Sequence, residues 1–131
     1  FTFEAAHKLD NTNDIKNKNI HGHSFHVTVF IKGDLGSNGM ILDFYTLENI
    51  ILSLKETLDH SFLNDIKGID LPTLENVGEW IWSRLKIEIK DLYKVKIERK
   101  SIFEILNFDI EVNNCLIIFT KFIWNFIFEH F

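Results

Sequence analysis

Cysteine and proline are almost absent from this chain of 131 residues, each occurring once. A single cysteine excludes an intramolecular disulfide framework and a zinc site built from several cysteines, and it fits a reducing compartment. A single proline excludes a proline-rich linker. Basic residues are outnumbered, because 14 Lys and Arg against 19 Asp and Glu give a net charge of -5. This balance argues against a nucleic-acid-binding surface.

No stretch of the sequence is long and apolar enough to predict a membrane-spanning helix. The longest candidate, residues 116–131, is interrupted by Lys121, Asn125 and Glu129, whereas a span needs about 20 predominantly apolar residues. No charged segment followed by an apolar one resembles a secretory signal. We therefore expect a cytoplasmic protein that binds no membrane. With 46% hydrophobic and 25% charged residues, the chain is predicted to form one globular domain.

Hydrophobic periodicity predicts an α+β order of strand, strand, helix, helix, strand. The alternating segments, each typical of a half-buried strand, are residues 1–9, 21–32 and 93–99. Apolar residues at helical spacing predict one helix after Asp43 and another after Thr73, with these two side chains as N-caps. Residues 10–19 are rich in Asn and Asp, so we expect a loop there.

The last quarter of the chain follows no clear pattern. Residues 101–131 are apolar without a clean period and without turn residues to divide them. Two explanations stay open: the segment contains poorly signalled strands or helices, or it is not native to the fold. We predict a domain at residues 1–100 followed by an atypical apolar segment at 101–131.

Three histidines lie on predicted strand faces that are otherwise apolar. His7 belongs to the apolar face of the first strand, and His21 and His23 belong to that of the second. Residues i and i+2 of a strand point to the same side, so antiparallel pairing of the two strands would bring the three imidazoles together. Three neutral imidazoles and one free position form a catalytic zinc site, in which the metal activates water or polarises a substrate oxygen. The alternative is that these are ordinary core or surface histidines.

Other candidate residues have simpler interpretations beside the functional ones. Asp59 next to His60 is either a pair for proton transfer or a solvated helix end, where a protonated histidine complements the helix dipole. Glu98 is most simply part of a charged strand surface, and Glu75 complements a helix dipole. His26 falls on the polar side of its strand and is interpreted as a surface histidine.

Five ordered motifs carry a resemblance to a known family. They are Phe3-Glu4-Ala5-Ala6-His7, His21-Gly22-His23-Ser24-Phe25, Gly39-Met40-Ile41-Leu42-Asp43-Phe44, Leu58-Asp59-His60-Ser61-Phe62-Leu63-Asn64 and Pro72-Thr73-Leu74-Glu75-Asn76. In this order and spacing, the chain resembles the 6-pyruvoyl-tetrahydropterin synthase family, and within it the bacterial 6-carboxy-5,6,7,8-tetrahydropterin synthases of queuosine (7-deazaguanine) biosynthesis. The resemblance implies a T-fold: an antiparallel β-sheet with two helices on one face, whose subunits join into a barrel, usually a hexamer.

The same resemblance implies a zinc site, a catalytic pair and a pterin pocket. The implied Zn2+ ligands are His7, His21 and His23, the catalytic pair is Asp59 and His60, and the pocket residues are Glu98, Thr73 and Glu75. Zinc at the three histidines agrees with the strand-face argument. Glu98 would anchor the pterin ring, because a carboxylate can accept two parallel hydrogen bonds from the amino-pyrimidinone edge. The other two pocket residues would lie near a subunit boundary.

Two positions depart from the family pattern. The family has a nucleophile-like cysteine four residues before the first histidine of His-Gly-His, and this chain has Asn17 there. An amide has no titratable group near pH 7, so Asn17 cannot replace a thiolate as general base. Threonine usually follows the anchoring glutamate, whereas this chain has Arg99.

The resemblance implies a zinc-dependent lyase that converts 7,8-dihydroneopterin triphosphate to 6-carboxytetrahydropterin, acetaldehyde and triphosphate. Lys16 and Lys18 flank the loop that would receive the triphosphate. Asn17 keeps two alternatives open. One is an impaired or non-catalytic homologue that binds zinc and pterin, and the other is a related side-chain enzyme of the 6-pyruvoyl-tetrahydropterin synthase or dihydroneopterin aldolase type. The expected partners are a small pterin and further copies of the chain, without nucleic acid or membrane.

Overall fold

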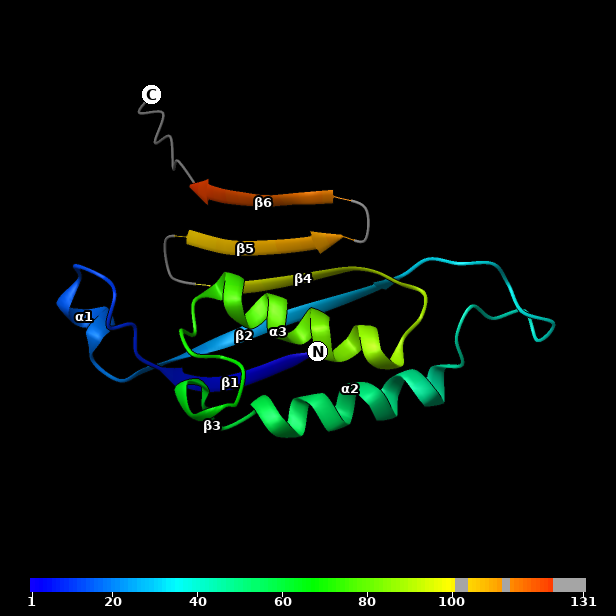
Figure 1. The fold of residues 1–131 in the computed structure, drawn as a ribbon, viewed down its shortest axis with the longest axis horizontal. Helices are drawn as coiled ribbons and strands as arrows, with labels where there is room; N and C mark the ends of the chain where they lie inside the picture. The colour runs from blue at the N-terminus through cyan, green and yellow to red at the C-terminus, as the bar shows by residue number, and fades with distance from the viewer. Residues whose placement is uncertain (101–103, 112–113, 124–131) are drawn as a thin grey trace, which may run out of the picture.

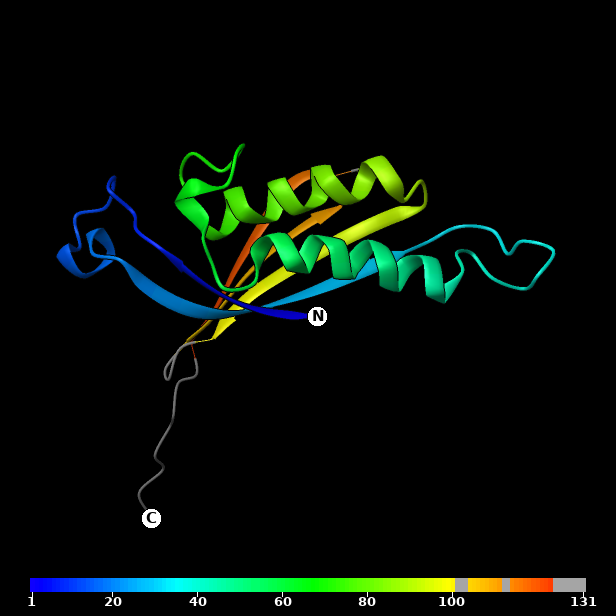
Figure 2. The ribbon, with the colours of Figure 1, turned by 90° about the horizontal axis from the view of Figure 1, so that it is seen from below.

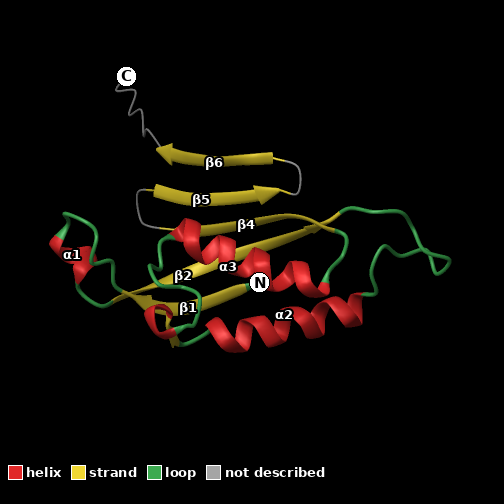
Figure 3. Cartoon of the chain, viewed as in Figure 1, coloured by secondary structure: helices red, strands yellow, loops and turns green. Residues whose placement is uncertain are grey.

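The computed structural model describes residues 1–100, 104–111 and 114–123. Its centre is a six-stranded sheet with the strand order β3-β1-β2-β4-β5-β6 (Figure 1, Figure 3). The strands are β1 (Thr2–His7), β2 (His21–Ile31), β3 (Ser61–Phe62), β4 (Leu92–Lys100), β5 (Glu104–Glu111) and β6 (Asn114–Ile123). Neighbouring strands of the described chain pair antiparallel, except that β3 runs parallel to β1.

Two long helices of the described chain cover one face of this sheet. They are α2 (Phe44–Leu58) and α3 (Leu74–Glu88). Figure 2 shows both on the same side of the strands. Asp43 and Thr73 cap these helices as predicted, because their side chains accept hydrogen bonds from backbone N–H groups in the first turn. The predicted α+β architecture, an antiparallel sheet with two helices on one face, is confirmed. The short β3 is an additional strand that pairs parallel to β1.

The core lies between the helices and the strands. Alternate residues of β1, β2 and β4 point toward the helices and are almost completely buried, namely Phe3, Phe25, Val27, Val95 and Ile97. Removing such side chains from water stabilises the fold by about 25 cal/mol per Å² of apolar surface. The same buried row continues at the end of β1 with His7, which is 2% exposed. A polar side chain in this position needs partners, and it has them.

The loop predicted between β1 and β2 contains one helical turn, α1 (Ile15–Lys18), which Asp14 caps. A hydrogen bond of 2.7 Å from the backbone N–H of Leu9 to the carbonyl of Asn17 ties the two sides of this loop together. A second short element, the 3₁₀ turn η1 (Leu63–Asp65), follows β3. Elements this short carry no full period of apolar residues, so hydrophobic periodicity does not predict them.

Beyond β4 the sheet continues into β5 and β6, which pair with each other and with β4. Poorly signalled strands are one of the two alternatives stated for residues 101–131. Residues 101–103, 112–113 and 124–131 of that segment lie outside the described residues, and the predicted division of the chain at residue 100 stays a prediction. Within the described parts of the chain, no helix has both the length and the hydrophobicity to cross a bilayer.

Candidate metal centre and active site

Pairing of β1 with β2 brings the three predicted metal ligands together. His7 lies opposite His21 in the antiparallel register, and His23 is two residues further along β2. The ring centroids are 4.6 Å apart for His7 and His21, 5.0 Å for His7 and His23, and 4.8 Å for His21 and His23. One ring nitrogen from each histidine lies within 4.8 Å of the other two. We call these three residues the imidazole trio.

Backbone carbonyls determine the protonation of two of these rings. His7 Nδ1 lies 2.7 Å from the Pro72 carbonyl oxygen, and His21 Nδ1 lies 2.7 Å from that of Asn19. A carbonyl oxygen can only accept, so each Nδ1 donates and each Nε2 keeps a lone pair. The two Nε2 atoms are 3.0 Å apart. Two lone pairs at this distance repel unless a cation lies between them, and the donor set therefore fits a metal ion.

The surroundings keep His7 and His23 neutral, as metal ligands must be. Burial lowers the pKa of His7 below its ordinary value. The pKa of His23 is lowered to about 3, first by burial and second by the positive charge of Arg99. Neutral imidazoles keep their lone pairs at neutral pH, so protons do not compete with a metal there.

Asp59 and His60 form a contact pair at the end of α2. Asp59 Oδ2 lies 3.1 Å from His60 Nδ1. Asp59 Oδ1 accepts a 2.8 Å hydrogen bond from the backbone N–H of Glu4, which lowers the pKa of Asp59. His60 has φ = 55°, a left-handed conformation that ends the helix and turns the chain into β3. The charged carboxylate can thus orient the imidazole, which remains 80% exposed.

A shallow hollow of about 400 Å³ lies beside the imidazole trio and the Asp59–His60 pair. Its lining includes His60, Glu4 of β1, and Gly22, His23 and Ser24 of β2. His23 of the imidazole trio and His60 of the Asp59–His60 pair therefore line the same hollow within a single chain. A glycine in its wall leaves the strand backbone open to close approach.

The predicted pterin-pocket residues do not gather around the imidazole trio within one chain. Glu98 points away from the helices, and its carboxylate forms an ion pair of 3.1 Å with Lys96 on the same strand face. Thr73 caps α3 directly after the carbonyl group that holds His7. Glu75 lies in the first turn of the same helix. Two of the three residues are thus near the helix terminus beside the trio, and the third is on the other side of the sheet.

Asn17 lies in α1, and its backbone carbonyl is tied to the segment that leaves β1. Leu9 follows His7 by two residues, and Asn17 precedes His21 by four. The position at which the family resemblance leads us to expect a cysteine is therefore within the loop that joins the two strands carrying the trio. His26, on the opposite face of β2 from His23, is exposed as expected.

Arg99 is a site residue whose contact the sequence reasoning missed. Its Nη1 atom lies 3.1 Å from His23 Nε2. β4 pairs with β2 so that Arg99 is opposite Phe25, which places it on the face of the trio. Side chains alternate along a strand, so Arg99 is expected on the same face of β4 as the buried Val95 and Ile97. The contact itself depends on the register between β2 and β4, which alternation does not reveal.

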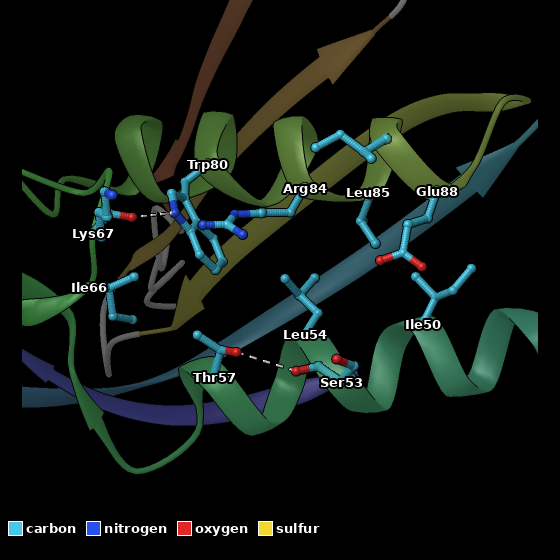
Figure 4. Close-up of a pocket in the computed structure, with 11 residues that line it drawn as sticks. Ile50, Ser53, Leu54, Thr57, Ile66, Lys67, Trp80, Arg84, Leu85 and Glu88 are labelled. Carbon is cyan, nitrogen blue, oxygen red and sulfur yellow. Dashed lines mark hydrogen bonds between the residues drawn. The ribbon is translucent and has the colours of Figure 1, made fainter.

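A separate pocket of about 470 Å³ lies between α2 and α3 (Figure 4). Leu54 and Leu85 face it from the two helices, and the guanidinium of Arg84 lies 5.0 Å from the Trp80 ring centroid at one end. Among the described residues that line it, none is a predicted ligand or catalytic residue. The candidate site is therefore at the end of β1 and β2 and not in this larger hollow.

Comparisons with known proteins place the chain among pterin enzymes. The sequence profile described as "6-pyruvoyl tetrahydropterin synthase" matches residues 1–112. The 6-carboxy-5,6,7,8-tetrahydropterin synthase of Synechocystis sp. is 40% identical over 92 residues, covering 66% of this chain and 70% of that protein. The dihydroneopterin monophosphate aldolase of Pyrococcus furiosus is 32% identical over 113 residues, covering 85% and 90%. The solved structure of Caenorhabditis elegans 6-pyruvoyl tetrahydropterin synthase matches with a TM-score of 0.72 and 28% identity, covering 86% of this chain and 91% of that chain.

Proposed function

Because the chain belongs to the 6-pyruvoyl tetrahydropterin synthase family, we propose that it is a cytoplasmic, zinc-dependent lyase of queuosine biosynthesis. The proposed reaction converts 7,8-dihydroneopterin triphosphate to 6-carboxy-5,6,7,8-tetrahydropterin, acetaldehyde and triphosphate. The observation that carries the proposal is the imidazole trio, in which two lone-pair nitrogens lie 3.0 Å apart. Similarity to the named Synechocystis synthase supports the choice of reaction.

The imidazole trio would hold the metal through nitrogen lone pairs and leave one position for substrate. Held by these residues, zinc would supply Lewis-acid chemistry, the polarisation of a hydroxyl oxygen of the substrate side chain. The chain itself orients the ligands, since the carbonyls of Pro72 and Asn19 hold the rings of His7 and His21. Such outer partners fix both the tautomer and the direction of a ligating imidazole.

His60 is the proposed proton carrier, with Asp59 as the residue that orients it. Asp59 accepts from the imidazole at Nδ1, which leaves Nε2 for the substrate. A positioned acid–base group contributes about 10²- to 10⁴-fold to a rate. Asn17 can donate and accept hydrogen bonds but cannot take a proton, so we expect turnover to be slow in the unaltered chain.

A second copy of the chain is proposed to complete the pterin pocket. Glu98 is on the opposite side of the sheet from the imidazole trio, so both can contact one pterin only if they come from different subunits. Exposed apolar side chains lie in and just after α1, with Ile15 75% and Ile20 67% exposed, and such surface is typical of contacts between proteins. The family resemblance suggests a barrel-shaped hexamer. Lys16 and Lys18 of α1 are both exposed and would receive the triphosphate.

A second candidate function is aldol cleavage of the side chain of a dihydroneopterin phosphate. The observation that favours it is the match to the Pyrococcus furiosus aldolase, which covers 85% of this chain, against 66% for the Synechocystis synthase. The thiol that the family resemblance assigns to the synthase reaction is replaced by Asn17, which also favours a different use of the same site. Aldol cleavage would release a hydroxyaldehyde fragment in place of acetaldehyde.

The experiment that tests the proposal is product analysis with the zinc-loaded protein. Dihydroneopterin triphosphate and dihydroneopterin monophosphate are supplied separately, and aldehydes are captured as hydrazones and identified by mass. Acetaldehyde together with triphosphate supports the synthase. A hydroxyaldehyde from the monophosphate supports the aldolase and contradicts the synthase. Zinc and pterin binding without any aldehyde leaves a non-catalytic binding protein.

A further inference from the structure

We propose that Arg99 competes with the metal for His23, so that a metal ion must displace the guanidinium before the imidazole trio can bind it. The inference rests on the proposed metal site and adds a determinant of its affinity. Arg99 Nη1 lies 3.1 Å from His23 Nε2. A guanidinium has only donors, so Nε2 of His23 must be the acceptor in this contact.

The competition follows from the number of lone pairs. A neutral imidazole has one nitrogen lone pair, and Arg99 uses the one on His23 Nε2. A metal ligand gives that same lone pair to the ion. His23 Nε2 therefore cannot accept from the guanidinium and ligate a metal at the same time. The positive charge of Arg99 beside a divalent cation adds repulsion, which a half-buried site screens poorly.

The other two members of the trio show that this arrangement is specific to His23. His7 and His21 each donate a hydrogen bond from Nδ1 to a backbone carbonyl, which leaves both Nε2 atoms directed toward each other. Among the described members of the trio, only His23 has an arginine donor at Nε2. Arg99 thus holds His23 in the tautomer that a metal requires, while occupying the atom that the metal would use.

Arg84 provides a matched control, because it is the other arginine of the sequence. Its guanidinium lies over the Trp80 ring at 5.0 Å, in the helical layer, and it lines the pocket between α2 and α3. Arg84→Met removes the same charge and the same side-chain length as Arg99→Met. It leaves the imidazole trio untouched.

The test measures zinc affinity by competition with a chromophoric chelator in the wild type, Arg99→Met, Arg99→Gln and Arg84→Met, with folding checked by circular dichroism. A hydrogen bond with a charged donor corresponds to about tenfold or more in affinity, so both Arg99 variants should bind zinc about tenfold more tightly than the wild type. Arg84→Met should stay within about twofold of the wild type, as surface changes do. Arg99→Gln decides the test if Arg99→Met does not fold.

A second readout follows the imidazole nitrogens of the metal-free protein by ¹H–¹⁵N NMR. In Arg99→Met, the ¹⁵N resonance of His23 Nε2 should move toward the chemical shift of an imidazole nitrogen that accepts no hydrogen bond. In Arg84→Met it should stay in place. Unchanged or weaker zinc affinity in the Arg99 variants would overturn the competition while leaving the metal site intact. If no variant and no wild-type protein binds zinc, the proposed metal site fails, and this inference fails with it.

Discussion

The imidazole trio and Glu98 belong to the same proposed site. A single chain supplies the complete trio, but it cannot bring its own Glu98 to the trio. The trio comes from two adjacent strands, with a loop of 13 residues between His7 and His21. Glu98 lies on the other face of the sheet, paired with Lys96. Under the proposed function, metal binding would be a property of the single chain, whereas pterin recognition would depend on a second copy. Variants that alter one of these requirements and leave the other intact distinguish the two.

The largest effect is expected from Asn17→Cys, which restores a titratable group beside the strands that carry the trio. Turnover should rise by about 10²- to 10⁴-fold, the usual contribution of a general base, because a thiol can ionise where an amide cannot. Zinc content should not change. Steady-state measurement of aldehyde release gives the rate. Asn17→Ser is the control, and an equal gain in that variant would show that the thiolate is not the missing group.

The next effect concerns pterin recognition alone. Glu98→Gln exchanges one acceptor oxygen for an NH₂ that faces the donors of the pterin ring. Such a buried mismatch corresponds to a loss of about 5- to 150-fold in affinity. Zinc content should remain at the wild-type level. Calorimetry with a dihydropterin measures the loss, and Glu79→Gln, at an exposed position of α3, is the control. Unchanged affinity in Glu98→Gln would leave this glutamate as part of a charged strand surface.

Mixing subunits tests directly whether the site extends across two chains. One chain carries His21→Ala, the other carries Glu98→Gln, and both carry Asn17→Cys to give measurable turnover. If each pocket takes the trio from one subunit and Glu98 from another, random assembly in a symmetric oligomer leaves about a quarter of the pockets intact. Turnover should therefore recover to about a quarter after the chains are unfolded and refolded together. A mixture as inactive as its components would place the whole site within one chain.

The smallest effect concerns the helix end that supports the trio. Thr73→Ala removes the N-cap of α3, and Asp43→Ala removes that of α2. Each should lower the free energy of unfolding by about 0.5–2 kcal/mol. Only Thr73→Ala should also weaken zinc binding, because the carbonyl that orients His7 precedes this cap. Chemical denaturation and zinc titration measure the two quantities. Equal zinc affinity in both variants would show that the start of α3 does not support zinc binding by the trio.

Local pattern predicted those parts of the molecule that depend on neighbouring residues. Alternation placed His7, His21 and His23 on one face, and the spacing of apolar side chains with Asp43 and Thr73 predicted both long helices and their caps. Alternation also puts Arg99 on the buried face of β4, but its contact with His23 requires the pairing of strands that are distant in the sequence.

Three further features could not be obtained from the pattern. The single turn of α1 is too short to carry a helical period. In the proposed two-chain pocket, the position of Glu98 relative to the trio would depend on how copies of the chain meet, and a symmetric interface is a property of the folded surface rather than of local periodicity. For residues 101–131 the apolar composition permits strands without specifying them, because composition without period does not separate buried strand from buried helix.

The most direct test of the metal centre is the zinc content of purified protein by inductively coupled plasma mass spectrometry, after metal removal and reloading. His21→Ala removes one of three ligands, and His26→Ala removes a histidine from the opposite face of the same strand. We expect about one zinc ion per chain in the wild type and in His26→Ala, and loss of stoichiometric zinc in His21→Ala, because three protein ligands leave none to spare. Equal zinc content in the two variants, or none in the wild type, would contradict the assignment of the imidazole trio as a metal site.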